Sequence, residues 1–149
     1  MGGFTTGRKE IIDMLRQRSR PYLFSNSVPP SVVGAGIETF KILKESNALH
    51  DKLVENVEYF RDKMMAAGFD IKPTQSAICA VMLYDAPLSQ KYAAALQEEG
   101  IYVTGFYYPV VPQGQARIRV QISAGHEREH LDKCINAFVK VGKELGVLK

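Results

Sequence analysis

The chain has 149 residues, 46% of them hydrophobic and 23% charged, with a formal net charge of +3. So slight a charge argues against nucleic acid as a partner, because proteins that bind it carry clustered basic residues. No apolar run approaches the roughly 20 residues that cross a bilayer, so we expect no membrane partner either.

The first third of the chain is predicted to be helical. One helix is expected from about Arg8 to Ser19, and Pro21 ends it because the residue before a proline is disfavoured in helical conformation. Residues 22–24 then form a short extended piece. Pro29 and Pro30 suit the start of a second helix, where a missing N–H costs nothing. Apolar residues continue along this helix at helical spacing: Val33, Ile37, Phe40 and Leu43.

The pattern changes from helix to strand in the middle of the chain. A third helix carries apolar residues from Leu49 to Ala67 at steps of three or four, and Gly68 supplies a left-handed stop. Residues 77–83 form an apolar run of strand length, which is typical of a strand covered on both faces. A helix beginning at Pro87 then ends at Gly100.

The last third predicts two strands, a loop and a final helix. Residues 101–104 are expected to form a short strand, and residues 105–115, rich in proline, glycine and aromatics, a loop. Residues 117–122 alternate strictly between polar and apolar, and a helix follows from about Glu129 to Leu145. Helices followed by β-α-β-β-α predict an α/β fold whose small antiparallel or mixed sheet has helices on one face.

Arg119 is the most informative single residue. The alternation places Arg117 and Arg119 on the face opposite Ile118, Val120 and Ile122. A guanidinium there can bind a carboxylate through two parallel hydrogen bonds. The alternative is that both arginines are solvated surface residues.

The segment Ser25-Asn26-Ser27 is a second candidate site. Its hydroxyl, amide and backbone donors precede a predicted helix, and helix N-termini attract anions. The alternative is an ordinary helix cap. Residues 126–130 spell His-Glu-x-x-His, a zinc hydrolase pattern, but Gly125 places His126 at the helix boundary and no third ligand follows. We therefore expect no metal site.

Three stretches of the sequence resemble one family of enzymes: residues 2–5, 19–27 and 105–126. They are similar to the C-terminal portion of the α-oxoamine synthases, enzymes of fold type I that depend on pyridoxal 5′-phosphate (PLP), and most closely to the glycine C-acetyltransferase branch. In this family the lysine that binds PLP precedes a Gly-Gly pair like Gly2-Gly3, and Lys9 does not match it. The resemblance therefore implies a fragment that is inactive alone and contains no catalytic residue.

The resemblance also implies roles for the two candidate sites. Ser25 and Asn26 match the segment that contacts the PLP phosphate of the partner subunit in a homodimer. Arg119, and not Arg117, matches the arginine that binds the carboxylate of glycine. The full-length enzyme would condense glycine with acetyl-CoA to 2-amino-3-oxobutyrate and CoA, a step of threonine catabolism. Residues 1–45 would end the large cofactor domain, and residues 46–149 would form the small α/β domain.

Two other functions are also compatible with the sequence. One is another α-oxoamine synthase, such as 8-amino-7-oxononanoate synthase, and the other is a non-catalytic α/β module that binds a small carboxylate. Cys79 and Cys134 lie in apolar segments and read as free thiols in a reducing compartment. We therefore predict a cytoplasmic protein, with the mitochondrial matrix as the alternative. Glu127 stands where the family usually has a serine or threonine helix cap.

Overall fold

A computed structural model describes residues 2–25 and 27–149 of the chain. The chain divides into two compact units, Met1–Asn47 and Ala48–Lys149. The first unit contains the helices α1 (Lys9–Arg18), α2 (Arg20–Phe24) and α3 (Pro30–Glu45), and none of the residues described in them is buried. The core therefore lies in the second unit.

Helix α2 corrects one expectation. Residues 22–24 were predicted to be extended, and the prediction is wrong because the chain forms a short helix there. Ser19 interrupts α1 in an extended conformation and stands as the N-cap of α2, and Pro21 occupies the first turn. A proline is tolerated in this turn because the first N–H groups of a helix have no partner within it.

The other helices were predicted correctly to within a few residues. Helix α3 begins at Pro30, and the Val32 N–H donates to the carbonyl of Pro29 at 2.9 Å. Helix α4 (Ala48–Ala66) is followed by Gly68 at a φ of +99°, which favours glycine because it has no Cβ. Helix α5 (Ala86–Glu98) begins at the N-cap Asp85, whose carboxylate accepts the Leu88 N–H.

The sheet of the second unit has four antiparallel strands in the order β1-β2-β4-β3. They are β1 (Ile71–Lys72), β2 (Ile78–Tyr84), β3 (Thr104–Phe106) and β4 (Ala116–Gln121). The predicted fold class is confirmed. Strand β1 was not predicted, and β3 begins at the end of the expected segment 101–104 because it pairs with β4 only from Thr104 onward.

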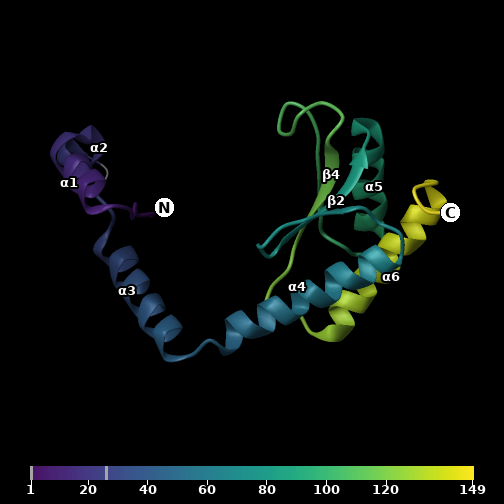
Figure 1. Ribbon diagram of the computed structural model, residues 1–149, viewed down its shortest axis with the longest axis horizontal. Helices are drawn as coiled ribbons and strands as arrows, with labels where there is room; N and C mark the ends of the chain where they lie inside the picture. Colours follow the sequence, from purple (N-terminus) through teal and green to yellow (C-terminus); the bar gives the residue numbers. More distant parts are fainter. Residues whose placement is uncertain (1, 26) are drawn as a thin grey trace. The chain divides into compact units, whose positions relative to one another are not determined.

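The core lies between one face of the sheet and three helices. Helices α4 and α6 (Arg128–Glu144) lie side by side (Figure 1), and both contribute to this core together with α5. Cys79, Val81 and Leu83 of β2 point into it. The other face of β2 is only partly covered, since Met82 is buried whereas Ile78 and Ala80 are half-buried, so the expectation of a strand covered on both faces is confirmed only in part.

Aromatic rings form the centre of this core. Phe138 of α6 is fully buried, and its ring lies 5.9 Å from that of Phe69, 6.4 Å from that of Phe60 and 5.7 Å from that of Tyr92. The Tyr92 hydroxyl donates to the backbone carbonyl of Phe138 at 2.5 Å. This bond joins α5 to α6 and satisfies a hydroxyl that has no access to water.

Helix α4 also holds the segment that leads into α6. The buried amide of Asn56 donates to the carbonyls of Ser123 and His126 at 3.2 and 2.9 Å. Two ion pairs and one hydrogen bond continue the contact: Lys52–Glu127 at 2.6 Å, Glu55–Arg128 at 3.0 Å and Tyr59–Asp132 at 2.5 Å. These contacts fix the end of β4 relative to the helices.

Candidate functional site

The sheet face opposite the core is the candidate site, and the strand register gives its layout. Along β4, Arg117, Arg119 and Gln121 point to this face, because successive side chains alternate. Ala80 of β2 and Thr104 of β3 are the Cα partners of Arg119. The remaining residues of the face stand beside Gln121 and Arg117: Ile78, Met82 and Phe106. We call these residues the open sheet face.

Arg119 lies at the centre of the open sheet face and is exposed. Its guanidinium carbon is 5.6 Å from the centre of the Phe106 ring, and Nη2 lies 3.5 Å from the Gln121 amide oxygen. Among residues 2–25 and 27–149, no carboxylate oxygen is within ion-pair distance of it. The guanidinium is therefore available to donate hydrogen bonds to a carboxylate from outside the chain.

Arg117 differs from Arg119 although both side chains point to the same face. Arg117 is half-buried, and its Nε donates to the backbone carbonyl of Gln115 at 3.0 Å. This bond ties the side chain to the end of the preceding loop. The two arginines, indistinguishable by alternation alone, thus have different surroundings.

The second candidate site is only partly described. Ser25 is the exposed C-cap of α2, and its N–H donates to the carbonyl of Pro21 at 3.2 Å. Asn26 lies outside the described residues. Ser25 belongs to the first unit and Arg119 to the second.

The zinc pattern has a structural explanation. His126 precedes α6, so the two histidines of the pattern do not share a helix face. Nδ1 of His126 accepts the Ser123 N–H at 3.2 Å, and Nδ1 of His130 accepts the Glu127 N–H at 3.0 Å. Over the described part of the chain, no group of three or more potential ligands could hold a metal ion. Both histidines stabilise the turn into α6, and Glu127 is the N-cap there.

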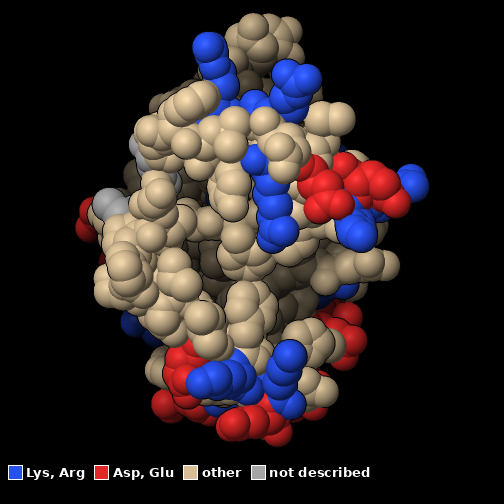
Figure 2. All heavy atoms as spheres, turned by 90° about the vertical axis from the view of Figure 1, so that its left-hand side faces the viewer, with Lys and Arg blue, Asp and Glu red and all other residues tan. Residues whose placement is uncertain are grey.

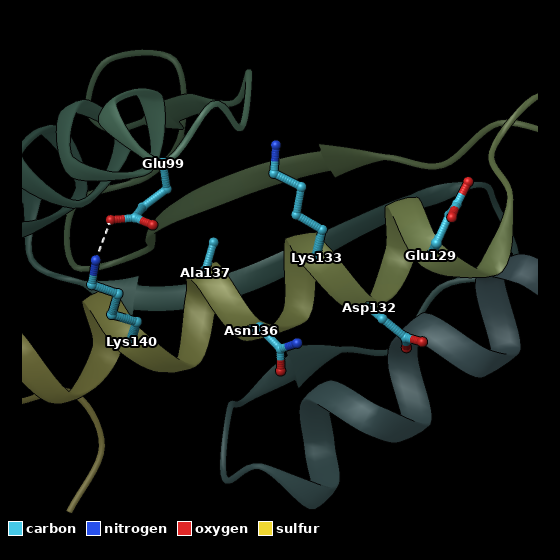
Figure 3. A pocket seen from close by; sticks show the side chains of 7 residues that line it. All are labelled: Glu99, Glu129, Asp132, Lys133, Asn136, Ala137 and Lys140. Atoms are coloured by element: carbon cyan, nitrogen blue, oxygen red, sulfur yellow. Dashed lines mark hydrogen bonds and ion pairs between the residues drawn. The ribbon is translucent and has the colours of Figure 1, made fainter.

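A hollow along α6 is lined by several charged side chains. It has a volume of about 540 Å³ and is drawn in Figure 3. Lys133 and Glu129 point to one side of the helix, and Asp132 and Asn136 point to the other (Figure 3). Glu99 is paired with Lys140 at 2.5 Å. These charges do not converge on one point where a ligand could bind.

The two cysteines are free, as predicted, and neither is activated. Burial raises the pKa of the Cys79 thiol and raises that of Cys134 to about 12. A thiolate is the reactive form of cysteine, so neither side chain suits a nucleophile at neutral pH.

On the face shown in Figure 2, Lys and Arg form small separate groups, several of them beside Asp and Glu, rather than one basic patch. No helix among the described residues is long and apolar enough to cross a membrane.

The second unit combines an antiparallel sheet, helices on one of its faces and an exposed arginine on the other. The chain belongs to the aminotransferase class I and II family, whose sequence pattern matches residues 1–138. The family resemblance read from the sequence is thereby confirmed.

Two curated relatives are similar to nearly the whole of this chain. The chain is 52% identical over 147 residues to the 2-amino-3-ketobutyrate coenzyme A ligase of Escherichia coli K12, covering 99% of this chain and 37% of the relative. It is 47% identical over 148 residues to the 8-amino-7-oxononanoate synthase of Thermosipho melanesiensis, covering 99% and 38%. The chain thus spans little more than a third of the length of these relatives.

A solved structure confirms the fold. A high-resolution structure of SPT with a PLP internal aldimine superposes with a TM-score of 0.86 at 29% identity, over 94% of this chain and 36% of that one.

Proposed function

We propose that this chain is part of a PLP-dependent acyltransferase that condenses glycine with acetyl-CoA to 2-amino-3-oxobutyrate and CoA. The observation that carries the proposal is Arg119, an exposed guanidinium on the open sheet face without a carboxylate partner among the described residues. The likeness to the 2-amino-3-ketobutyrate coenzyme A ligase, at 52% identity, supports the same assignment. We propose this activity for a protein as long as these relatives, of which the present chain spans little more than a third.

The role of Arg119 is to bind and orient the amino acid. Two parallel N–H···O bonds from a guanidinium fix a carboxylate in both distance and angle, and each contributes on the order of 1.5–3 kcal/mol. Holding the carboxylate in this way restricts rotation of the substrate, so that its Cα carbon is presented in one orientation. We assign no catalytic residue within this chain.

Ser25 and Asn26 are proposed to contact the PLP phosphate. Ser25 fits this role because its hydroxyl is exposed and can donate to a phosphate oxygen. When bound, PLP supplies an electron sink for the carbanion formed at the substrate Cα. In the homodimer that we propose, this contact reaches the cofactor of the partner subunit. Residues 1–45 would then complete the large cofactor domain, and residues 46–149 would be the small domain.

The free thiols Cys79 and Cys134 suit a reducing compartment. We therefore propose a cytoplasmic location, with the mitochondrial matrix as the alternative.

Replacing Arg119 by lysine in the full-length protein tests the proposal. An ammonium cannot form the two-pronged contact, so the KM for glycine should rise roughly ten-fold or more. Arg117→Lys is the matched control, because this arginine shares the strand and face but is bonded to Gln115. Equal glycine KM values in the Arg119 variant and the parent would contradict the proposal.

An 8-amino-7-oxononanoate synthase is the second candidate, and the relative at 47% identity supports it. Mass spectrometry of the product separates the two enzymes. Formation of 2-amino-3-oxobutyrate from glycine and acetyl-CoA supports the first assignment, and formation of 8-amino-7-oxononanoate supports the second. A third candidate, the non-catalytic carboxylate-binding module, would bind glycine tightly without PLP in calorimetry of the 149-residue chain.

A further inference from the structure

The guanidinium of Arg119 is held by few neighbours. Its Cα partners on the adjoining strands are Ala80 and Thr104, whose short side chains leave space around it. Arg117, two residues away, bonds to the Gln115 carbonyl instead. An exposed arginine with several rotatable bonds would sample many positions unless another group restricts it.

Phe106 supplies such a restriction. It is the Cα partner of Arg117, so its ring lies on the open sheet face, diagonally opposite Arg119. The Arg119 guanidinium carbon lies over this ring at 5.6 Å, within the range of a cation–π interaction. Phe106 is half-buried, which fixes the ring itself better than a fully exposed residue would.

Gln121 provides a second contact on the other side. Its amide oxygen lies 3.5 Å from Nη2 of Arg119, a long contact that is easily replaced by a better acceptor. A substrate carboxylate oxygen could take this position without moving the guanidinium away from the ring. The contacts with the Phe106 ring and the Gln121 amide therefore hold the Arg119 guanidinium near the position in which it would bind a carboxylate.

We propose that Phe106 is a positioning residue that orients Arg119 for the carboxylate of the amino-acid substrate. The inference rests on the proposed function, because it assumes that Arg119 binds this carboxylate. Orienting the guanidinium before the substrate arrives reduces the side-chain entropy lost on binding. Phe106 should consequently affect the affinity for the amino acid and have little effect on the acyl donor.

The experiment compares Phe106→Leu and Phe106→Tyr in the full-length enzyme with the parent. Loss of an exposed cation–π contact should raise the KM for glycine roughly two- to five-fold, with kcat and the KM for acetyl-CoA nearly unchanged. Phe106→Tyr retains the aromatic face and should restore the parent value. Tyr102→Leu is the control for losing an aromatic ring, because Tyr102 is 94% exposed.

A double-mutant cycle separates positioning from a general effect on structure. In an Arg119→Gln background, Phe106→Leu should cause no further change in the KM for glycine, because there is no guanidinium left to orient. The same fold-change in both backgrounds, or an unchanged KM in Phe106→Leu alone, would overturn the inference.

A spectroscopic measurement on the 149-residue chain tests the contact between Phe106 and Arg119 independently of the proposed function. If Arg119→Gln leaves the KM for glycine unchanged, the proposed function is wrong. The NMR signal of the Arg119 Nε–H then still tests the contact: Phe106→Leu should shift it by removing the ring current, and Tyr102→Leu should not. An unshifted signal in Phe106→Leu would refute the positioning role.

Discussion

The hydroxyl of Tyr92 forms a hydrogen bond in the core whose contribution to the free energy of unfolding can be measured separately. Tyr92→Phe removes this hydroxyl and leaves the buried ring in place, 5.7 Å from that of Phe138. In this variant the carbonyl of Phe138 can still accept the helical hydrogen bond of α6 from the N–H of Gly142, which lies four residues further along. No buried group is thus left without a partner.

The expected loss is the net contribution of one hydrogen bond, about 0.5–1.5 kcal/mol of unfolding free energy. Removing the whole ring in Tyr92→Ala should cost about 3–5 kcal/mol, because it also leaves a cavity. Urea unfolding followed through the core methyl signals of the second unit measures both. With a slope of about 1–3 kcal/mol per molar urea, Tyr92→Phe should lower the midpoint by roughly 0.2–1.5 M.

Two results would refute this reasoning. An unchanged or higher midpoint in Tyr92→Phe would mean that the bond from the hydroxyl to the Phe138 carbonyl does not stabilise the fold. A loss as large as that of Tyr92→Ala would mean that the hydroxyl supports more than the single bond seen at 2.5 Å.

Three further predictions concern the same unit. Gly142→Ala should destabilise the chain in urea unfolding, although alanine favours helices over glycine by about 1 kcal/mol. The reason is that the new Cβ would lie 3.0 Å from the Tyr92 hydroxyl and 3.1 Å from Leu148. The loss of stability should be smaller in a Tyr92→Phe background, and an equal loss in both backgrounds would exclude the hydroxyl as the cause. At pH 8, iodoacetamide should label neither Cys79 nor Cys134 before urea is added, because burial raises the pKa of both thiols and keeps them protonated; rapid labelling of the folded chain would contradict this. Lys52 lowers the pKa of the Glu127 carboxyl in the folded chain. The stabilisation from this pair is therefore fully present above the pKa that the carboxyl has when unfolded, and it is lost as pH falls through the lower folded pKa. In an NMR titration, Lys52→Met should raise the pKa of Glu127, and an unchanged pKa would show that the pair does not cause the shift.

Local sequence patterns were sufficient for most of the elements. The apolar spacing along α4 and α6 and the strict alternation along β4 predicted their type because each pattern depends only on neighbours within a few residues. Alternation also placed Arg119 on the face opposite the core, and the resemblance of residues 105–126 distinguished it from Arg117. Ser25 and Asn26 stay predictions that rest on the same resemblance.

Only the tertiary structure decided which side chains meet. Phe106 was predicted to lie in a loop, and its position beside Arg119 follows from the pairing of β3 with β4, a register between distant segments that no local pattern contains. The contacts of Asn56 with Ser123 and His126 likewise join segments 67 and 70 residues apart. The sequence alone thus determined which faces are apolar and where a guanidinium is available, because these depend on residue type and period. The surroundings of that guanidinium depend on packing, because contacts between remote segments are selected only when the whole core forms.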